Sequence, residues 1–386
     1  MQSSGHDEPL TAQTVRARLE TCGASAQASS VLFDDDAAGM LESVGRNIEN
    51  YIGALTIPVG VIGPLSVNGT HGPWNGYVPL ATTEAALVAS YGRGAKTITE
   101  AGGCAARVTA AAISRAPAFT LSDLPAALRF AEWMTASRDA LAAAAARTTR
   151  YGRLIAVDAS VEGNRVYASL QFTTGEAAGQ NMVTIATHAV CEYVLEHSPV
   201  PICGHFIEAN FSGDKKATTM SLLGVRGRRV SAEVRLDARA VERNLHTTPE
   251  LLCEYWRVGA VGAAMAGQIG IQGHYANALA ALYLATGQDA ACVAESAIGI
   301  TRFEVAGDGS LYASVTLPNV VVGTVGGGTQ LPSQRACSEL LRLPGEGGAD
   351  TLAEIAAALC LAGELSISAA ICADHFARAH QQLARG

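Results

Sequence analysis

Hydrophobic and polar residues follow two different periods along this chain. Residues 154–159 and 165–172 are two strand-like runs, separated by the turn sequence Val161-Glu162-Gly163-Asn164, which predicts two strands joined by a hairpin. Apolar runs over 51–67, 229–236 and 311–322, with glycine and proline nearby, predict further strands. Helices are predicted over seven segments: 11–21, 81–93, 122–147, 177–195, 256–267, 274–286 and 350–384.

The order of these elements indicates an α+β fold with more than one domain. A chain of 386 residues is too long for one ordinary core. Residues 109–205 contain strands and helices of their own, which predicts a small α+β domain inserted in a larger one. Residues 1–37 are polar and rich in small side chains, and they predict a partly ordered arm with one weak helix.

Composition narrows the classes of protein. Hydrophobic residues make up 49% of the chain and charged residues 16%, so most of it is expected to fold around a large core. A net charge of −8 disfavours nucleic-acid partners, since phosphates are bound by basic surfaces. The nine cysteines show no CxxC spacing, which argues against a zinc or redox motif and fits a reducing cytoplasm. No signal pattern and no apolar run near the ~20 residues of a membrane span is evident, so we expect a cytoplasmic protein without a metal or a membrane partner.

Lysine is rare, and its distribution is uneven. Only Lys96, Lys215 and Lys216 are present, and arginine supplies the remaining formal positive charge. A lysine can act as a compact partner for an oxyanion and can change its pKa when buried, whereas arginine cannot do the second. Chance in an arginine-biased composition explains the adjacent pair about as well.

Three further residues could take part in acid–base chemistry, although each has a simpler explanation. Glu84 lies in the predicted first turn of an apolar helix, where it could keep a proton as a general acid or only complement the helix dipole. Asp289 follows a hydrophobic helix and could be only a cap. His375 lies on the last predicted helix, where a lone histidine is usually a packed or surface residue.

Two segments could contact a phosphate. Residues 323–329 contain four glycines after a predicted strand, so backbone N–H groups could approach an anion, although a tight packing turn is the commoner reason for such a sequence. Arg150 follows two threonines, and its planar guanidinium suits a ribose phosphate, although a single arginine is more often a solvated surface charge.

Longer motifs connect these scattered signals in a fixed order. They are residues 49–53 (ENYIG), 57–65 (IPVGVIGPL), 78–84 (VPLATTE), 214–216 (DKK), 285–289 (ATGQD), 323–330 (GTVGGGTQ) and 362–366 (AGELS) ahead of His375. In this order, from about residue 40 to residue 382, the chain resembles the 3-hydroxy-3-methylglutaryl-coenzyme A (HMG-CoA) reductase family. The motifs are long and specific, and they cover nearly the whole chain.

The resemblance implies a domain organisation and partners. It implies an N-terminal helical arm over 1–37 and a large helix-centred domain for substrate and CoA over 38–108 and 219–386. A small ferredoxin-like domain for NADP(H) over 109–205 and an active-site connecting loop over 206–218 complete the chain. The family members reduce an acyl-CoA with NADPH, so NADPH and an acyl-CoA are the expected ligands. They build the active site between subunits, which implies a homodimer or a larger homo-oligomer.

The resemblance also implies roles for single residues. Lys215 is expected to stabilise the thioester oxygen, Glu84 to give a proton to the aldehyde oxygen, Asp289 to lie between these two, and His375 to protonate the departing thiolate. The implied substrate contacts are Arg107, Glu208, Asp214, Lys216 and Asn277. The implied cofactor contacts are Thr149, Arg150, Tyr151, Glu176, Gly179, Gln180, Asn181, Gly326, Gly327 and Gly328, with Arg150 on the 2′-phosphate.

Three differences from the family pattern bear on the substrate. Glu176 stands where the family has aspartate, and the stretch 270–277 is one residue shorter. Glu208 replaces a serine and Val258 a lysine among the residues that hold the substrate carboxylate, although Arg257 adjoins Val258. An unpaired Glu208 at ~4 Å from that carboxylate costs roughly 4 kcal/mol. HMG-CoA reduction to mevalonate is therefore the leading hypothesis, a paralogue for another acyl thioester the second, and a non-catalytic relic the third.

Overall fold

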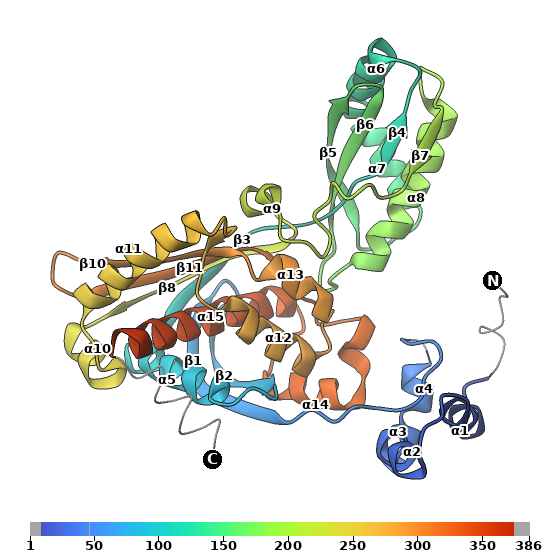
Figure 1. The fold of residues 1–386 in the computed structure, drawn as a ribbon. Helices are drawn as coiled ribbons and strands as arrows, with labels where there is room; N and C mark the ends of the chain where they lie inside the picture. The colour runs from blue at the N-terminus through green and yellow to red at the C-terminus, as the bar shows by residue number, and fades with distance from the viewer. Residues whose placement is uncertain (1–8, 46, 374–386) are drawn as a thin grey trace.

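One long strand, β3 (Cys104–Arg115), is shared by two sheets in the computed structural model, which describes residues 9–45 and 47–373 (Figure 1). Its first part pairs with β8 (Gly227–Leu236), and its last three residues pair with β6 (Arg165–Thr173). Strand β3 was not predicted, because its alanine-rich sequence favours a helix by local propensity. Pairing with strands of both sheets outweighs that preference.

The larger sheet carries most of the predicted strands. Its order is β2-β1-β3-β8-β11-β10-β9, with β1 parallel to β3 and β9 parallel to β10, while the other neighbours are antiparallel. The predictions near 51–67, 229–236 and 311–322 are confirmed by β1, β8 and β11, whereas β2, β9 and β10 were not predicted. The remaining bounds are β1 (Val59–Gly69), β2 (Gly72–Ala81), β9 (Gly270–Ile271), β10 (Gly299–Val305) and β11 (Leu311–Val320).

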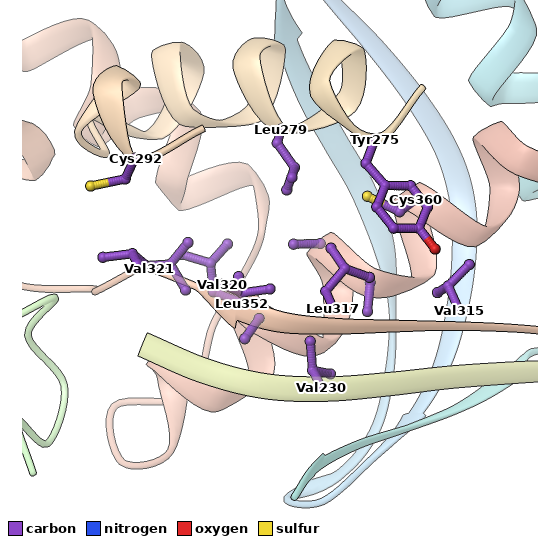
Figure 2. Packing of buried hydrophobic residues seen from close by; sticks show 14 of the residues in the cluster. Val230, Tyr275, Leu279, Cys292, Val315, Leu317, Val320, Val321, Leu352 and Cys360 are labelled. Carbon is purple, nitrogen blue, oxygen red and sulfur yellow. The ribbon is translucent and has the colours of Figure 1, made fainter. Parts of the chain in front are cut away.

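The core of this part is the helix α15 (Gly348–Cys372), which packs against β3, β8 and β11 on one side (Figure 2). On its other sides lie α5 (Leu87–Glu100), α11 (Pro249–Met265) and α12 (Tyr275–Thr286). The crossing with α5 is close, because a Cβ at Gly94 would lie 2.0 Å from the carbonyl oxygen of Ala362. The abundance of glycine and alanine therefore serves close helix packing.

Helix α15 also corrects one expectation. An 18-residue window of it has a mean hydropathy of 2.0, so by length and composition it could cross a membrane, contrary to the prediction that no such run exists. Within the fold, 83% of that window is buried, as expected of a largely apolar core helix. The helix begins close to the predicted residue 350, and its predicted part beyond residue 373 lies outside the described residues.

The smaller sheet forms a ferredoxin-like unit, as predicted. Its elements follow the order β-α-β-β-α-β, and its strands lie in the order β7-β4-β6-β5, with β3 and β4 together as the first strand. Alternate residues of β6 are buried, which places the helices on one face. The predicted hairpin is confirmed, and the predicted helix over 122–147 is two helices. The bounds are β4 (Ala118–Thr120), α6 (Leu124–Ala136), α7 (Arg138–Ala146), β5 (Arg153–Glu162), α8 (Gln180–His197) and β7 (Gly204–Phe206).

The N-terminal residues form a separate small core. Val15, Leu19, Phe33 and Tyr51 pack together, and this arm lies to one side of the sheets (Figure 1). The predicted helix over 11–21 is confirmed, with Thr11 as its N-cap. Its helices are α1 (Ala12–Thr21), α2 (Ala26–Leu32), α3 (Asp35–Gly39) and α4 (Leu41–Val44), which continue past the predicted end of the arm at residue 37.

The connection between β2 and α5 differs from the prediction. Pairing with Val59 extends β2 to Ala81, and α5 begins only at Leu87, so Glu84 lies in an exposed loop and not in a helical first turn. The hydroxyl of Thr82 accepts the N–H of Glu84 at 3.0 Å and shapes that loop. The remaining elements are α9 (Thr219–Leu223), α10 (Ala238–Leu245), η1 (Ala290–Cys292), α13 (Val293–Ser296), η2 (Gly327–Gln330) and α14 (Pro332–Leu340).

Candidate active site

Lys215 and Asp289 form an ion pair that is partly exposed to solvent. The Nζ of Lys215 lies 2.8 Å from Oδ2 of Asp289, and their side chains are 44% and 40% exposed. The hydrogen bond to Asp289 raises the pKa of Lys215 above its usual value, so this lysine stays an ammonium at neutral pH. A fixed and accessible ammonium can stabilise negative charge on a bound oxygen.

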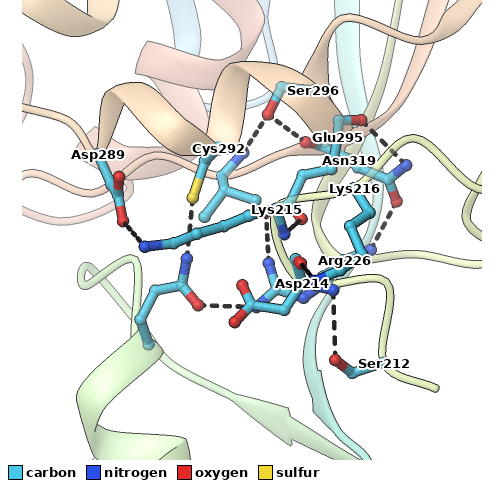
Figure 3. Close-up of polar contacts among 12 residues, drawn as sticks. Ser212, Asp214, Lys215, Lys216, Arg226, Asp289, Cys292, Glu295, Ser296 and Asn319 are labelled. Atoms are coloured by element: carbon cyan, nitrogen blue, oxygen red, sulfur yellow. Dashed lines mark hydrogen bonds and ion pairs between the residues drawn. The ribbon is translucent and has the colours of Figure 1, made fainter. Parts of the chain in front are cut away.

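Buried charges hold the loop that carries Lys215 (Figure 3). Lys215 has a left-handed backbone with φ 56°, and its N–H donates to the carboxylate of Glu295, which is fully buried. Burial raises the pKa of Glu295, although the adjacent Arg226 opposes this. For Asp214 burial works in the same direction, but Arg226 and Arg115 outweigh it and lower the pKa of that carboxyl.

Sequence analysis missed Arg115, Arg226 and Glu295. Each is nine-tenths or more buried, and charged side chains are seldom buried without partners. The sequence feature that could have identified these charged residues as buried is their position among apolar or small residues. Arg115 ends a run of small residues, and Glu295 follows Cys292-Val293-Ala294. Which charges would pair could not be read from the sequence, because the partners come from distant segments.

Glu84 belongs to a second group, at the opposite end of α12. Asn277, in the first turn of α12, donates to both carboxylate oxygens of Glu84 at 3.1 and 3.2 Å. Asp289 follows the other end of this 12-residue helix, and a rise of 1.5 Å per residue separates the two ends by roughly 18 Å. In the part of the chain that the structure describes, no hydrogen bond joins Glu84 to Asp289 or Lys215, so the expected contact of Asp289 with both is not made within one chain. His375 lies outside the described residues.

A cavity of about 450 Å³ opens beside Glu84. Its wall is mostly apolar and includes side chains from the last described turns of α15, and Arg93 lies at its edge with its guanidinium bonded to Ser366. The lining includes Leu87, Tyr91, His274, Ile367, Ala370 and Ile371.

The predicted cofactor residues gather around the first turn of α8. Gly179 is the N-cap of this helix, and Asn181 is exposed on its first turn. The glycine loop lies against the preceding residues, because the N–H of Thr324 donates to the carbonyl of Glu176 at 2.8 Å. Gly328 in turn packs against the backbone of Gly287, two residues before Asp289. The loop therefore lies between α8 and the Lys215–Asp289 pair.

The predicted phosphate contacts lie on the other side of this turn. A Cβ at Gly152 would touch Met182 of α8, so residues 149–151 lie next to it. The hydroxyl of Thr149 accepts the N–H groups of Tyr151 and Gly152 and forms a turn. Arg150 and Tyr151 at its tip are exposed, as a phosphate contact requires.

Two predicted cofactor side chains already have partners within the chain. The carboxylate of Glu176 accepts the N–H groups of Gly347 and Ala349 at 2.8 and 2.7 Å and caps the N-terminus of α15. The amide of Gln180 accepts from Arg226 at 2.7 Å and donates to the sulfur of Cys292 at 2.8 Å. Both therefore shape the site from within.

The predicted substrate contacts fall into two groups. Lys216 donates to the carbonyl of Asp214 at 2.9 Å, and Glu208 lies 3.8 Å from Arg115 and accepts the N–H of Ala116. Arg107 lies nine residues before Ala116 along β3, and at ~3.3 Å per residue about 30 Å separates the two. Its guanidinium donates to the carbonyl of Asn68, beyond the reach of Glu208 in the same chain.

Comparison with known proteins assigns a family to this arrangement. Residues 14–385 match the family model described as hydroxymethylglutaryl-coenzyme A reductase. A protein of Pyrococcus horikoshii named 3-hydroxy-3-methylglutaryl-coenzyme A reductase is 44% identical over 352 residues, which are 89% of this chain and 85% of the relative. A protein of the same name from Methanothermobacter thermautotrophicus is 41% identical over 380 residues, 97% of this chain and 94% of the relative.

Solved structures share the fold at low sequence identity. The class II 3-hydroxy-3-methylglutaryl-CoA reductase of Streptococcus pneumoniae, determined with NADPH bound in open conformations, aligns with a TM-score of 0.67 at 21% identity. The alignment covers 92% of this chain and 86% of that one. This likeness establishes the arrangement of the two sheets and the helices.

Proposed function

The chain belongs to the hydroxymethylglutaryl-coenzyme A reductase family, and from this premise we propose that it reduces HMG-CoA to mevalonate and CoA with NADPH. The observation that carries the proposal is the Lys215–Asp289 ion pair, set in a family match that covers nearly the whole chain. Its free thiols fit the reducing cytoplasm in which we place it.

The residues around the first turn of α8 fit NADPH. Gly326 and Gly327 have left-handed backbones with open space where a side chain would be, so a dinucleotide can approach their N–H groups. The exposed Arg150 and Tyr151 can reach a 2′-phosphate and an adenine face. Two molecules of NADPH, bound one after the other, would supply the two hydrides that convert a thioester to an alcohol. Residues 109–205 are therefore proposed as the cofactor-binding domain.

Four side chains of the protein supply the charge stabilisation and the proton transfers of the reaction. Lys215 stabilises the negative charge that develops on the substrate oxygen in each reduction. Asp289 holds the Lys215 ammonium in place through the 2.8 Å contact. Glu84, oriented by Asn277, gives a proton to the aldehyde oxygen in the second reduction. His375 protonates the CoA thiolate when it leaves the hemithioacetal.

These groups can act together only across a subunit interface. A separation of roughly 18 Å along α12 keeps Glu84 of one chain from the Lys215 of that chain. We therefore propose a homodimer in which the Glu84 end of one protomer faces the Lys215 end of its partner. Arg107 and Lys216 would then contact the substrate from opposite protomers, and the cavity beside Glu84 would receive the pantetheine arm of CoA.

The surroundings of Glu208 indicate whether the substrate is HMG-CoA or another acyl thioester. Its position 3.8 Å from Arg115 and its bond from the N–H of Ala116 pair its charge within the chain, which favours HMG-CoA. A paralogue that binds a cationic acyl group through Glu208 is the second candidate. The intact Lys215–Asp289 pair argues against a non-catalytic relic.

An assay of purified protein with NADPH and a panel of acyl-CoAs tests the proposal. Oxidation of NADPH with HMG-CoA, together with release of CoA thiol, supports an HMG-CoA reductase. Turnover of other acyl-CoAs alone supports the paralogue, and failure to bind NADPH supports the relic.

Replacing Glu208 by serine separates the first two candidates. Because Glu208 lies 3.8 Å from Arg115 and accepts the N–H of Ala116, we expect Glu208→Ser to change the KM for HMG-CoA by less than about threefold. Steady-state kinetics with wild type as the control measures this. A KM that falls by more than about tenfold would show that Glu208 repels the substrate carboxylate.

Replacing Asp289 by asparagine is expected to move the alkaline limb of the pH–kcat profile to lower pH. Asp289 raises the pKa of Lys215, and activity requires the ammonium, so activity is lost as the pH rises through that pKa. Removing the carboxylate lowers the pKa, and the loss then begins at a lower pH. An alkaline limb that coincides with that of wild type would contradict the coupling of these two groups.

A further inference from the structure

Arg226 is the most deeply buried member of the charge cluster below Lys215, with 1% of its side chain exposed. Its guanidinium donates to three groups from three separate segments (Figure 3). These are the carboxylate of Glu295 in α13, the carboxylate of Asp214 at 2.7 Å in the loop, and the side-chain oxygen of Gln180 at 2.7 Å. One arginine therefore joins the loop, the large domain and the first residue of α8.

The first two contacts fix the backbone of Lys215. Glu295 accepts the N–H of Lys215, and Asp214 is the residue directly before Lys215. Arg226 binds the carboxylates of both Glu295 and Asp214, so it holds the backbone of Lys215 from two sides. Lys215 itself has a long side chain that is 44% exposed, and only its end is held, by Asp289. The position of the ammonium therefore depends on where its backbone is anchored.

The third contact reaches the unit that fits NADPH. Gln180 begins α8, and its amide also donates to Cys292, three residues after Asp289. Arg115 adds a parallel link, because it donates to Asp214 at 2.6 Å and to Thr184 of α8 at 3.0 Å. A displacement of the first turn of α8 must therefore displace the guanidinium of Arg226 or break its bond.

We propose that Arg226 is a positioning residue that couples binding of NADPH at the first turn of α8 to the placement of the Lys215 ammonium. The inference rests on the proposed function, which assigns the cofactor to α8 and the oxyanion contact to Lys215. Gln180 is the connecting side chain, so its amide serves the coupling and not only the cofactor.

The scarcity of lysine permits a test that does not depend on turnover. Acylation of lysines by a water-soluble reagent, followed by mass spectrometry of peptides, reports the reactivity of Lys215 with Lys96 as an internal reference, since Lys96 is exposed on α5. We expect saturating NADPH to change the labelling rate of Lys215 by at least about threefold in wild type. In Gln180→Met, with NADPH occupancy verified by fluorescence titration, we expect a change below about 1.5-fold.

Kinetics of Arg226→Lys provide the second readout. A lysine cannot contact three partners at once, so we expect kcat to fall about 100-fold while the KM for HMG-CoA stays within about threefold. Arg235→Met is the control, because Arg235 lies on β8, which begins directly after Arg226, is 60% exposed and, among the described residues, forms an ion pair with Asp308 alone. It is expected to leave kcat unchanged.

Two results would overturn the proposal. One is an NADPH effect on Lys215 labelling in Gln180→Met equal to that in wild type, since direct shielding by the cofactor survives this change. The other is a kcat of Arg226→Lys within about threefold of wild type. If Arg226→Lys does not fold, the labelling of Gln180→Met decides alone. A wild-type protein that shows the labelling effect but no turnover of HMG-CoA contradicts the proposed function and leaves the coupling supported.

Discussion

Replacement of Lys215 by alanine is expected to lower kcat by about 10³-fold or more, which makes it the most damaging single change in this chain. The side chain supplies the only ammonium that Asp289 holds at the open site, among the residues that the structure describes. Its removal leaves the developing charge on the substrate oxygen without a partner. The fold is expected to persist, because the anchoring bond to Glu295 comes from the backbone N–H and not from the side chain.

Steady-state kinetics and thermal unfolding measure the two parts of this prediction. Lys96→Ala is the control, because Lys96 is 69% exposed on α5 and, within the described ranges, forms an ion pair with Glu100 alone, four residues further on. We expect it to leave both kcat and Tm near the wild-type values. Near-full activity of Lys215→Ala would remove the lysine from the reaction, and a large fall in its Tm would make the loss of activity a folding effect.

Mixing two inactive variants is expected to restore activity. If each site combines Glu84 of one protomer with Lys215 of its partner, a dimer of one Glu84→Gln chain and one Lys215→Ala chain has one intact site and one doubly damaged site. Random reassociation makes half of the dimers mixed, so about 25% of the wild-type activity should return from two preparations that are each nearly inactive.

The arrangement along α12 is the reason for this expectation, since it separates Glu84 from Asp289 and Lys215 in one chain. The measurement is the rate of NADPH oxidation after the two variants have been dissociated together and reassociated. Glu84→Gln mixed with the double variant Glu84→Gln/Lys215→Ala is the control, because no combination of those chains contains an intact site. Absence of recovery, with mixed dimers verified by native mass spectrometry, would place both groups in one chain.

Local patterns in the sequence predicted the local structure well. The strand β6 alternates between buried and less buried residues along its length, and pairs such as Asp158 with Ser169 keep one register from Ala156 to the turn, although a bulge interrupts it between Leu154 and Ala156. The glycine loop and the DKK motif were also located correctly as irregular segments next to the candidate site. In these cases the signal and the structure involve the same few residues.

Features that depend on distant partners were not predictable in the same way. The alanine-rich text of β3 favours a helix, and only its neighbours β8 and β6 make it a strand. Glu84 was placed in a helix because β2 extends further than its own sequence indicates. Arg226 and Glu295 are separated by 69 positions, so nothing in either segment identifies the other as its partner.

The strand β3 limits how the two parts of the molecule can move. Its backbone runs without interruption from the larger sheet into the ferredoxin-like unit, and a covalent chain in extended form cannot lengthen. Separation of the two parts along the strand direction is therefore excluded, whereas rotation about β3 and bending of β3 remain possible. Movements of the ferredoxin-like unit relative to the larger sheet should accordingly pivot near Arg115, where β3 passes from β8 to β6.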